Sequence, residues 1–87
     1  MPRVFIPAQL RDLTGGVAQV EIQASTVREV IDELERQFPG IKERLCKGED
    51  LAPSLQVSID HRMTGRGMSA KVGPQSEVHF LPVLGGG

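Results

Sequence analysis

Residues 26–40 read Thr-Val-Arg-Glu-Val-Ile-Asp-Glu-Leu-Glu-Arg-Gln-Phe-Pro-Gly, and this stretch predicts the main helix of the fold. Thr26 and Glu29 have the spacing of a capping box, in which a hydroxyl and a carboxylate accept hydrogen bonds from the first free N–H groups of a helix. Pro39 and Gly40 then end the helical pattern, because neither residue continues a helix well. The sequence therefore marks both ends of this helix.

The two faces of the predicted helix differ in polarity. Its apolar side chains recur every three or four residues, at Val27, Val30, Ile31, Leu34 and Phe38. The other face is charged, and it places Arg28 and Arg36 each four residues from Asp32, where ion pairs are possible. A helix with one apolar face is expected to cover a core.

Strand-like alternation of apolar and polar side chains lies on both sides of the helix. Residues 3–7 and 19–23 flank Gly15-Gly16, so we expect an antiparallel hairpin with a long loop. After the helix we expect a helical turn at 41–45, a polar loop at 47–50, a strand at 55–59, a short edge strand or loop at 62–67, and a last strand at 77–81. This order predicts an α+β domain with a mixed sheet of four to five strands over one main helix.

The last strand runs into glycines without a polar linker: Leu81-Pro82-Val83-Leu84-Gly85-Gly86-Gly87. We expect a domain at residues 1–81 and a flexible tail at 82–87, which spans roughly 20 Å when fully extended. Glycine has the smallest cross-section, so such a tail can enter a narrow channel of another protein and present its carboxylate. A terminus without a role, or a remnant of an expression vector, is the alternative.

The composition argues against several classes of partner and site. Ten basic and eleven acidic side chains in 87 residues nearly cancel, which gives no reason to expect nucleic acid or an anionic membrane as a partner. The single cysteine, Cys46, excludes an internal disulfide framework and a multi-cysteine metal site. No apolar run approaches the length of a membrane span and no targeting segment is recognisable, so we expect a cytoplasmic protein.

The order of elements and the apolar strand ending in Gly-Gly resemble the ubiquitin-like β-grasp sulfur carriers of the MoaD/ThiS family. The resemblance covers nearly the whole chain. The segments Ile6-Pro7-Ala8-x-Leu10-Arg11-x-x-Thr14-Gly15-Gly16 and Phe38-Pro39-Gly40-Ile41-x-x-Arg44-Leu45 are most similar to its CysO branch, which serves cysteine synthesis. The chain's ending is similar to the family's Leu-Pro-x-x-Ala-Gly-Gly, with Gly85 in the alanine position.

The resemblance implies a mechanism in which this chain is a substrate and not an enzyme. A ubiquitin-activating-type enzyme would use ATP to adenylate the Gly87 carboxylate, and a sulfur source would displace AMP and leave a thiocarboxylate. Gly85 and Gly86 would lie in the channel of the partner, and Leu81, Pro82, Val83 and Leu84 would form an apolar patch against it. A PLP-dependent cysteine synthase would accept the sulfur, and a metalloprotease would release the product; thiamine, molybdopterin or a specialised metabolite are other destinations.

The resemblance leaves two other functions open, and the sequence departs from the family pattern at one turn. The chain could instead be a ubiquitin-like modifier joined through Gly87 to target lysines, or a β-grasp binding module with an inert tail. Family members usually carry Gly-Asp before the last strand, whereas here Gly73 is followed by Pro74, so the contact made by that aspartate is in question.

The polar side chains of the body predict no catalytic group and no metal site. We interpret Cys46 as a packing residue, because a lone cysteine after an apolar helical turn is usually a small apolar side chain. His79 alternates with Val78 and Phe80 and is expected on the solvent side of the last strand. His61 beside Asp60 makes a turn, and one histidine with one carboxylate is no metal site. The basic side chains of residues 60–67 have no assigned role.

Overall fold

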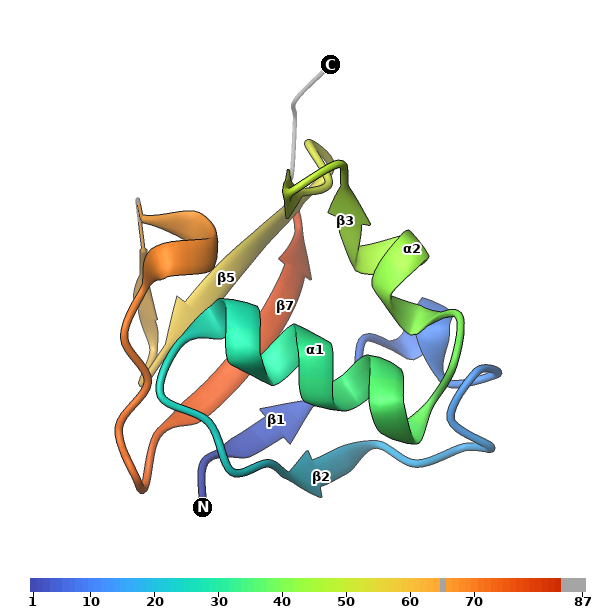
Figure 1. Ribbon diagram of the computed structural model, residues 1–87, viewed down its shortest axis with the longest axis horizontal. Helices are drawn as coiled ribbons and strands as arrows, with labels where there is room; N and C mark the ends of the chain where they lie inside the picture. The colour runs from blue at the N-terminus through green and yellow to red at the C-terminus, as the bar shows by residue number, and fades with distance from the viewer. Residues whose placement is uncertain (65, 84–87) are drawn as a thin grey trace.

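The computed structural model describes residues 1–64 and 66–83, and Figure 1 shows one helix lying across a twisted sheet. The sheet has five strands in the order β2-β1-β7-β5-β6. Their bounds are Arg3–Phe5 for β1, Gln19–Glu21 for β2, Leu55–Ile59 for β5, Arg62–Met63 for β6 and Glu77–Pro82 for β7. β1 pairs parallel with β7, and every other pairing in this sheet is antiparallel. The predicted mixed sheet over one main helix is confirmed.

The first hairpin forms as predicted, with Val4 opposite Val20. Its long loop contains the short 3-10 helix η1 (Ala8–Leu10) and closes at Gly15 and Gly16, whose φ angles are 68° and 92°. The Thr14 hydroxyl holds this loop by bonding the Val17 carbonyl at 2.9 Å. Positive φ favours glycine, so the loop depends on this pair.

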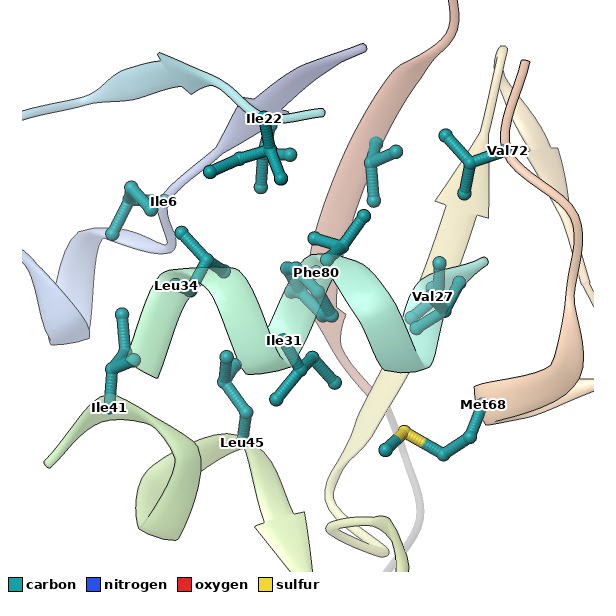
Figure 2. Close-up of a cluster of buried hydrophobic side chains, with 14 of the residues drawn as sticks. Ile6, Ile22, Val27, Ile31, Leu34, Ile41, Leu45, Met68, Val72 and Phe80 are labelled. Atoms are coloured by element: carbon teal, nitrogen blue, oxygen red, sulfur yellow. The ribbon is translucent and has the colours of Figure 1, made fainter. Parts of the chain in front are cut away.

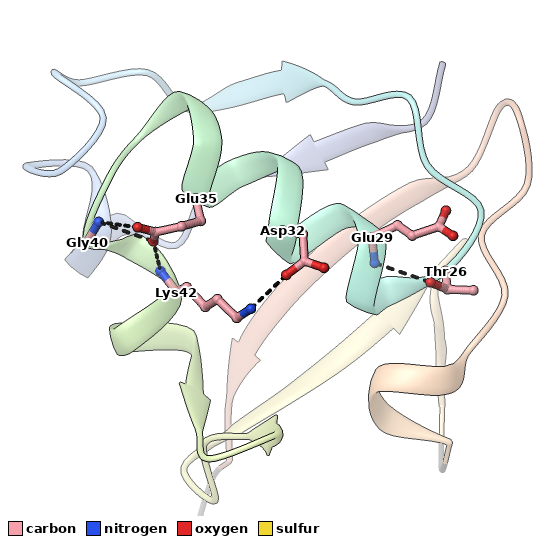
Figure 3. A network of polar contacts seen from close by, with 6 residues as sticks. All are labelled: Thr26, Glu29, Asp32, Glu35, Gly40 and Lys42. Carbon is pink, nitrogen blue, oxygen red and sulfur yellow. Dashed lines mark hydrogen bonds and ion pairs between the residues drawn. The ribbon is translucent and has the colours of Figure 1, made fainter.

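The main helix α1 spans Val27–Gln37. Of the two hydrogen bonds of the predicted capping box, one forms and the other has a different donor. The Thr26 hydroxyl accepts a hydrogen bond from the Glu29 N–H at 3.2 Å (Figure 3). The Glu29 carboxylate, however, accepts from the N–H of Ser25 at 2.7 Å, where a capping box would use the N–H of Thr26. Ser25 and Val27 are bonded to the backbone of residues 70–72, and this extended pairing points the Ser25 N–H toward Glu29.

We expect Thr26→Ala to lower the free energy of unfolding by about 1 kcal/mol, because it leaves the Glu29 N–H without its side-chain acceptor. Chemical denaturation followed by circular dichroism measures this change. Thr26→Ser keeps the hydroxyl and serves as the control, with a loss of only a few tenths of a kcal/mol expected. An equal loss in both variants would contradict the capping role of the hydroxyl.

The ion pairs predicted along α1 are wrong. Asp32 pairs with Lys42 instead of an arginine, at 2.7 Å, and Arg36 pairs with Glu33 at 3.0 Å. The reason is the second helix α2 (Ile41–Leu45), which folds back beside α1 after Gly40 (Figure 3). The Glu35 carboxylate accepts the Lys42 N–H at 2.9 Å and also the Gly40 N–H, so it joins the two helices.

The core lies between the helices and the sheet (Figure 2). The predicted apolar face of α1 is fully buried at Val27, Val30, Ile31 and Leu34, whereas Phe38 is half-buried at the rim. Met68, Ala70 and Val72 complete the core, although no sequence pattern predicted that these three residues are buried. They come from the 3-10 helix η2 (Gly67–Ser69) and an irregular stretch, which have no regular period to detect.

The polar loop predicted at residues 47–50 is part of a second, two-stranded sheet. β3 (Cys46–Lys47) pairs antiparallel with β4 (Asp50–Leu51) around Gly48. Strands of two residues are too short to show alternation, so the sequence pattern did not reveal them.

Candidate functional site

The end of β7 is held by one neighbouring strand only. Pairing with β1 stops at Phe5 and His79, because the chain turns into η1 after Pro7. Pairing with β5 continues to Pro82, and the Val83 N–H still donates to the Ser54 carbonyl at 2.9 Å. The strand therefore continues past Leu81. Its last residues extend beyond the end of β1 and are paired only on the β5 side.

These last residues present apolar side chains to solvent. Leu81 is 36% exposed, Val83 is 41% exposed and Pro82 is exposed as well, so their predicted exposure is confirmed. We call Leu81, Pro82 and Val83 the apolar strand end. Leu84, Gly85, Gly86 and Gly87, which the sequence assigns to the patch and the tail, lie outside the described residues. An exposed apolar group at the exit of the tail is typical of an interaction site.

The sheet face opposite α1 carries an aromatic stack that sequence reasoning missed. The rings of Phe5 and His79 are parallel with centroids 4.2 Å apart, and the ring of His61 is 6.2 Å from that of His79. His79 lies on the predicted face, but its Nε2 atom is buried and has no hydrogen-bond partner among the described residues. The expected position of His79 on the solvent side is confirmed, since its side chain is 29% exposed, although the cross-strand neighbour Phe5 stacks on its ring.

Asp60 links the turn between β5 and β6 to the start of β7. Its carboxylate accepts the Glu77 N–H and the Ser76 hydroxyl, both at 2.9 Å. These donors hold the pKa of the Asp60 carboxyl below its ordinary value. Asp60 and His61 have φ angles of 53° and 68°, which a type I′ turn requires. Asp60 thus places a carboxylate at the turn where the family's Gly-Asp pair is missing.

Because the folded pKa of Asp60 is depressed, its contribution to stability is present above the unfolded pKa near 3.8 and is lost as the pH falls through the lower folded value. We expect Asp60→Asn to be less stable than the unmodified protein at neutral pH, and the difference to shrink below roughly pH 4. Urea midpoints across this range measure the effect. Asp12→Asn, at an exposed position, is the control, and a difference for Asp60→Asn that is constant with pH would contradict the prediction.

Cys46 is half-buried at the start of β3 and packs against the core. Burial raises the pKa of its thiol, which disfavours the reactive thiolate. A hollow of about 330 Å³ lies beside it, lined by Glu35, Lys42 and Glu43 among others. Glu35 accepts the Lys42 N–H and the Lys42 ammonium pairs with Asp32, so these two side chains hold α1 and α2 together. The packing interpretation of Cys46 agrees with this arrangement.

Within residues 1–64 and 66–83, no three His, Cys, Asp or Glu side chains lie where they could share a metal ion. Over the same residues, no helix is long and apolar enough to cross a membrane.

Comparison with known proteins shows the family to which this chain belongs. The model of the ThiS family matches residues 4–87, which is nearly the full chain. The chain belongs to the ThiS family. The MoaD/ThiS resemblance and the β-grasp fold expected from it are thereby confirmed.

Relatives of this ThiS-family chain are named sulfur carriers. It is 32% identical to the sulfur carrier protein CysO of Mycobacterium tuberculosis strain H37Rv, over 97% of this chain and 96% of that protein. It superposes on a chain of the BexX/CysO complex of Amycolatopsis orientalis with a TM-score of 0.89 and 37% identity, over 100% of both chains. The small archaeal modifier protein 1 of Methanosarcina acetivorans, with a TM-score of 0.81 and 21% identity over 99% of this chain and 95% of that one, shares the fold.

Proposed function

We propose that this protein is a sulfur carrier of the CysO kind whose Gly87 carboxylate is converted to a thiocarboxylate. The observation that carries the proposal is the end-to-end similarity to named sulfur carrier proteins. The apolar strand end supports it, because Leu81 and Val83 are exposed and lie within four residues of the first of the three glycines. The chemistry would belong to partner enzymes, so this chain acts as their substrate.

The proposed reaction has two steps. An adenylating enzyme joins the Gly87 carboxylate to AMP from ATP and releases pyrophosphate, which turns a poor electrophile into one with a good leaving group. A hydrosulfide donor then attacks the acyl carbon and displaces AMP, leaving sulfur in place of one oxygen. Gly87 lies four residues after Val83, so its carboxylate reaches at most about 14 Å beyond the last described hydrogen bond of the strand.

The thiocarboxylate would pass its sulfur to a biosynthetic enzyme. CysO from Amycolatopsis orientalis crystallises in complex with BexX, which supports the presence of a protein partner for this carrier too. The similarity to CysO favours cysteine synthesis, with a PLP-dependent synthase as the acceptor and a metalloprotease that releases the product.

Intact mass measurement tests the proposal. The protein is incubated with the adenylating enzyme of its own organism, ATP and a sulfide source. We expect a gain equal to the replacement of one oxygen by sulfur, located in the C-terminal peptide. Conjugates joined through Gly87 to lysines of other proteins would instead establish a modifier, and no change of either kind would refute both functions.

A further inference from the structure

A hollow of about 400 Å³ lies between the edge strand β6 and the residues around η2. Three cationic side chains line it, namely Arg62, Arg66 and Lys71, together with the apolar residues Ile59, Met63 and Ala70. We call this site the basic hollow. It contains the arginines of the 60–67 segment, to which the sulfur-carrier chemistry assigns no role.

The three cations of the basic hollow are open to an external anion. Arg62, Arg66 and Lys71 are all exposed. Within residues 1–64 and 66–83, no carboxylate lies within ion-pair distance of them, and no Asp or Glu lines the hollow. Three like charges around one hollow repel one another mildly, so an acidic partner gains from neutralising them.

The backbone beside the hollow is also available for pairing. β6 is the outermost strand of the five-stranded sheet, and Arg62 and Met63 pair with β5 on one side only. An extended segment that adds to such an edge gains main-chain hydrogen bonds and places alternate side chains on the two faces. The shape and charge of the basic hollow therefore fit an extended acidic segment with apolar residues between its carboxylates.

The basic hollow and the tail exit lie close enough for one partner to contact both. β5 pairs with Pro82 through Leu55 and with Arg62 through Ile59. Leu55 and Ile59 are about 13 Å apart along β5, and β7 and β6 lie on opposite sides of it, so Pro82 and Arg62 are about 16 Å apart. A standard protein interface covers about 800 Å² on each side, or roughly 30 Å across, so it spans this distance easily.

The chemistry of the tail indicates which partner needs this contact. A glycine tail has no side chains, so the enzyme that activates it meets a carboxylate like that of any glycine-ended chain and must recognise the folded body. After activation, the thiocarboxylate itself marks the loaded carrier for the acceptor. We propose that the basic hollow docks an acidic segment of the enzyme that adenylates Gly87. This inference rests on the proposed function.

Steady-state kinetics of adenylation test the docking. The rate of pyrophosphate release is measured against carrier concentration for the unmodified protein and for Arg62→Glu with Arg66→Glu. Charge reversal at a docking surface weakens association and leaves the chemical step unchanged, so we expect KM for the carrier to rise about tenfold or more, with kcat within about twofold. The rise in KM should shrink at high salt, because screening weakens both attraction and repulsion.

Arg28→Glu with Arg44→Glu is the matched control, since it makes the same change of net charge at exposed positions on the two helices. Circular dichroism checks that both variants fold. An unchanged KM for the Arg62 and Arg66 variant would overturn the docking proposal and leave the arginines as protection of a strand edge. An equal rise in the control, or a loss confined to kcat, would overturn it as well. No turnover of the unmodified protein would instead refute the proposed carrier function.

Discussion

Deleting Gly86 and Gly87 is expected to abolish thiocarboxylate formation and to leave the folded body intact. The deletion moves the terminal carboxylate back by about 7 Å, and a displacement of even 1 Å at a reacting centre costs about a hundredfold in rate. We therefore expect less than about one thousandth of the original rate, measured as the sulfur-for-oxygen mass gain over time. The melting temperature should change little, because the deletion retains β7 and Val83, whose N–H donates to the Ser54 carbonyl.

Two substitutions separate the length of the tail from its width. Gly85→Ala should remain active, since the MoaD/ThiS endings that this chain resembles carry alanine there. Gly86→Val should be inactive at full length, because a β-branched side chain widens and stiffens the segment that must enter the partner's channel. Activity in the truncated protein would contradict the role of Gly87. A large fall in its melting temperature would show that the tail contributes to the fold.

Leu34→Ala is expected to lower the free energy of unfolding by about 3 kcal/mol. Leu34 is fully buried in the core that α1 forms with the sheet (Figure 2). Removing its branched end costs transfer free energy and leaves a cavity. A domain of this size has a total stability of only about 5–13 kcal/mol, so the loss is a large fraction of it.

Urea denaturation followed by far-ultraviolet circular dichroism measures this loss, since the chain has no tryptophan or tyrosine for fluorescence. Val17→Ala is the control, because Val17 is 39% exposed and should lose less than about 0.5 kcal/mol. Both variants should keep the denaturant slope of the unmodified protein. A loss at Leu34 no larger than that at Val17 would mean that the core around α1 is loosely packed.

The elements with a strong local period were predicted correctly. The apolar spacing of α1, its end before Pro39 and the alternation of β5 and β7 depend on residues that are neighbours in the sequence. The exposure of Leu81 and Val83 was also predictable, because both follow an alternation whose buried members are Val78 and Phe80.

Features made by contacts between distant segments were not predictable. The burial of Met68 and Val72 and the pairing of Asp32 with Lys42 each depend on where the chain returns in space. The β3–β4 hairpin is local, but its two-residue strands are too short to show a period. The cover that Phe5 provides over His79 depends on the parallel register of β1 and β7, which lie at opposite ends of the sequence.

For this protein, the sequence by itself determined the fold class, the main helix and the run of three glycines on which the proposed function depends. These features are encoded in periods of two or about 3.6 residues, in capping residues and in the order of amino acids at the end of the chain. Only the tertiary structure decided that Asp60 supports the turn before the last strand, and that Arg62, Arg66 and Lys71 surround one hollow. Such arrangements depend on the relative positions of packed elements, and no local pattern carries that information.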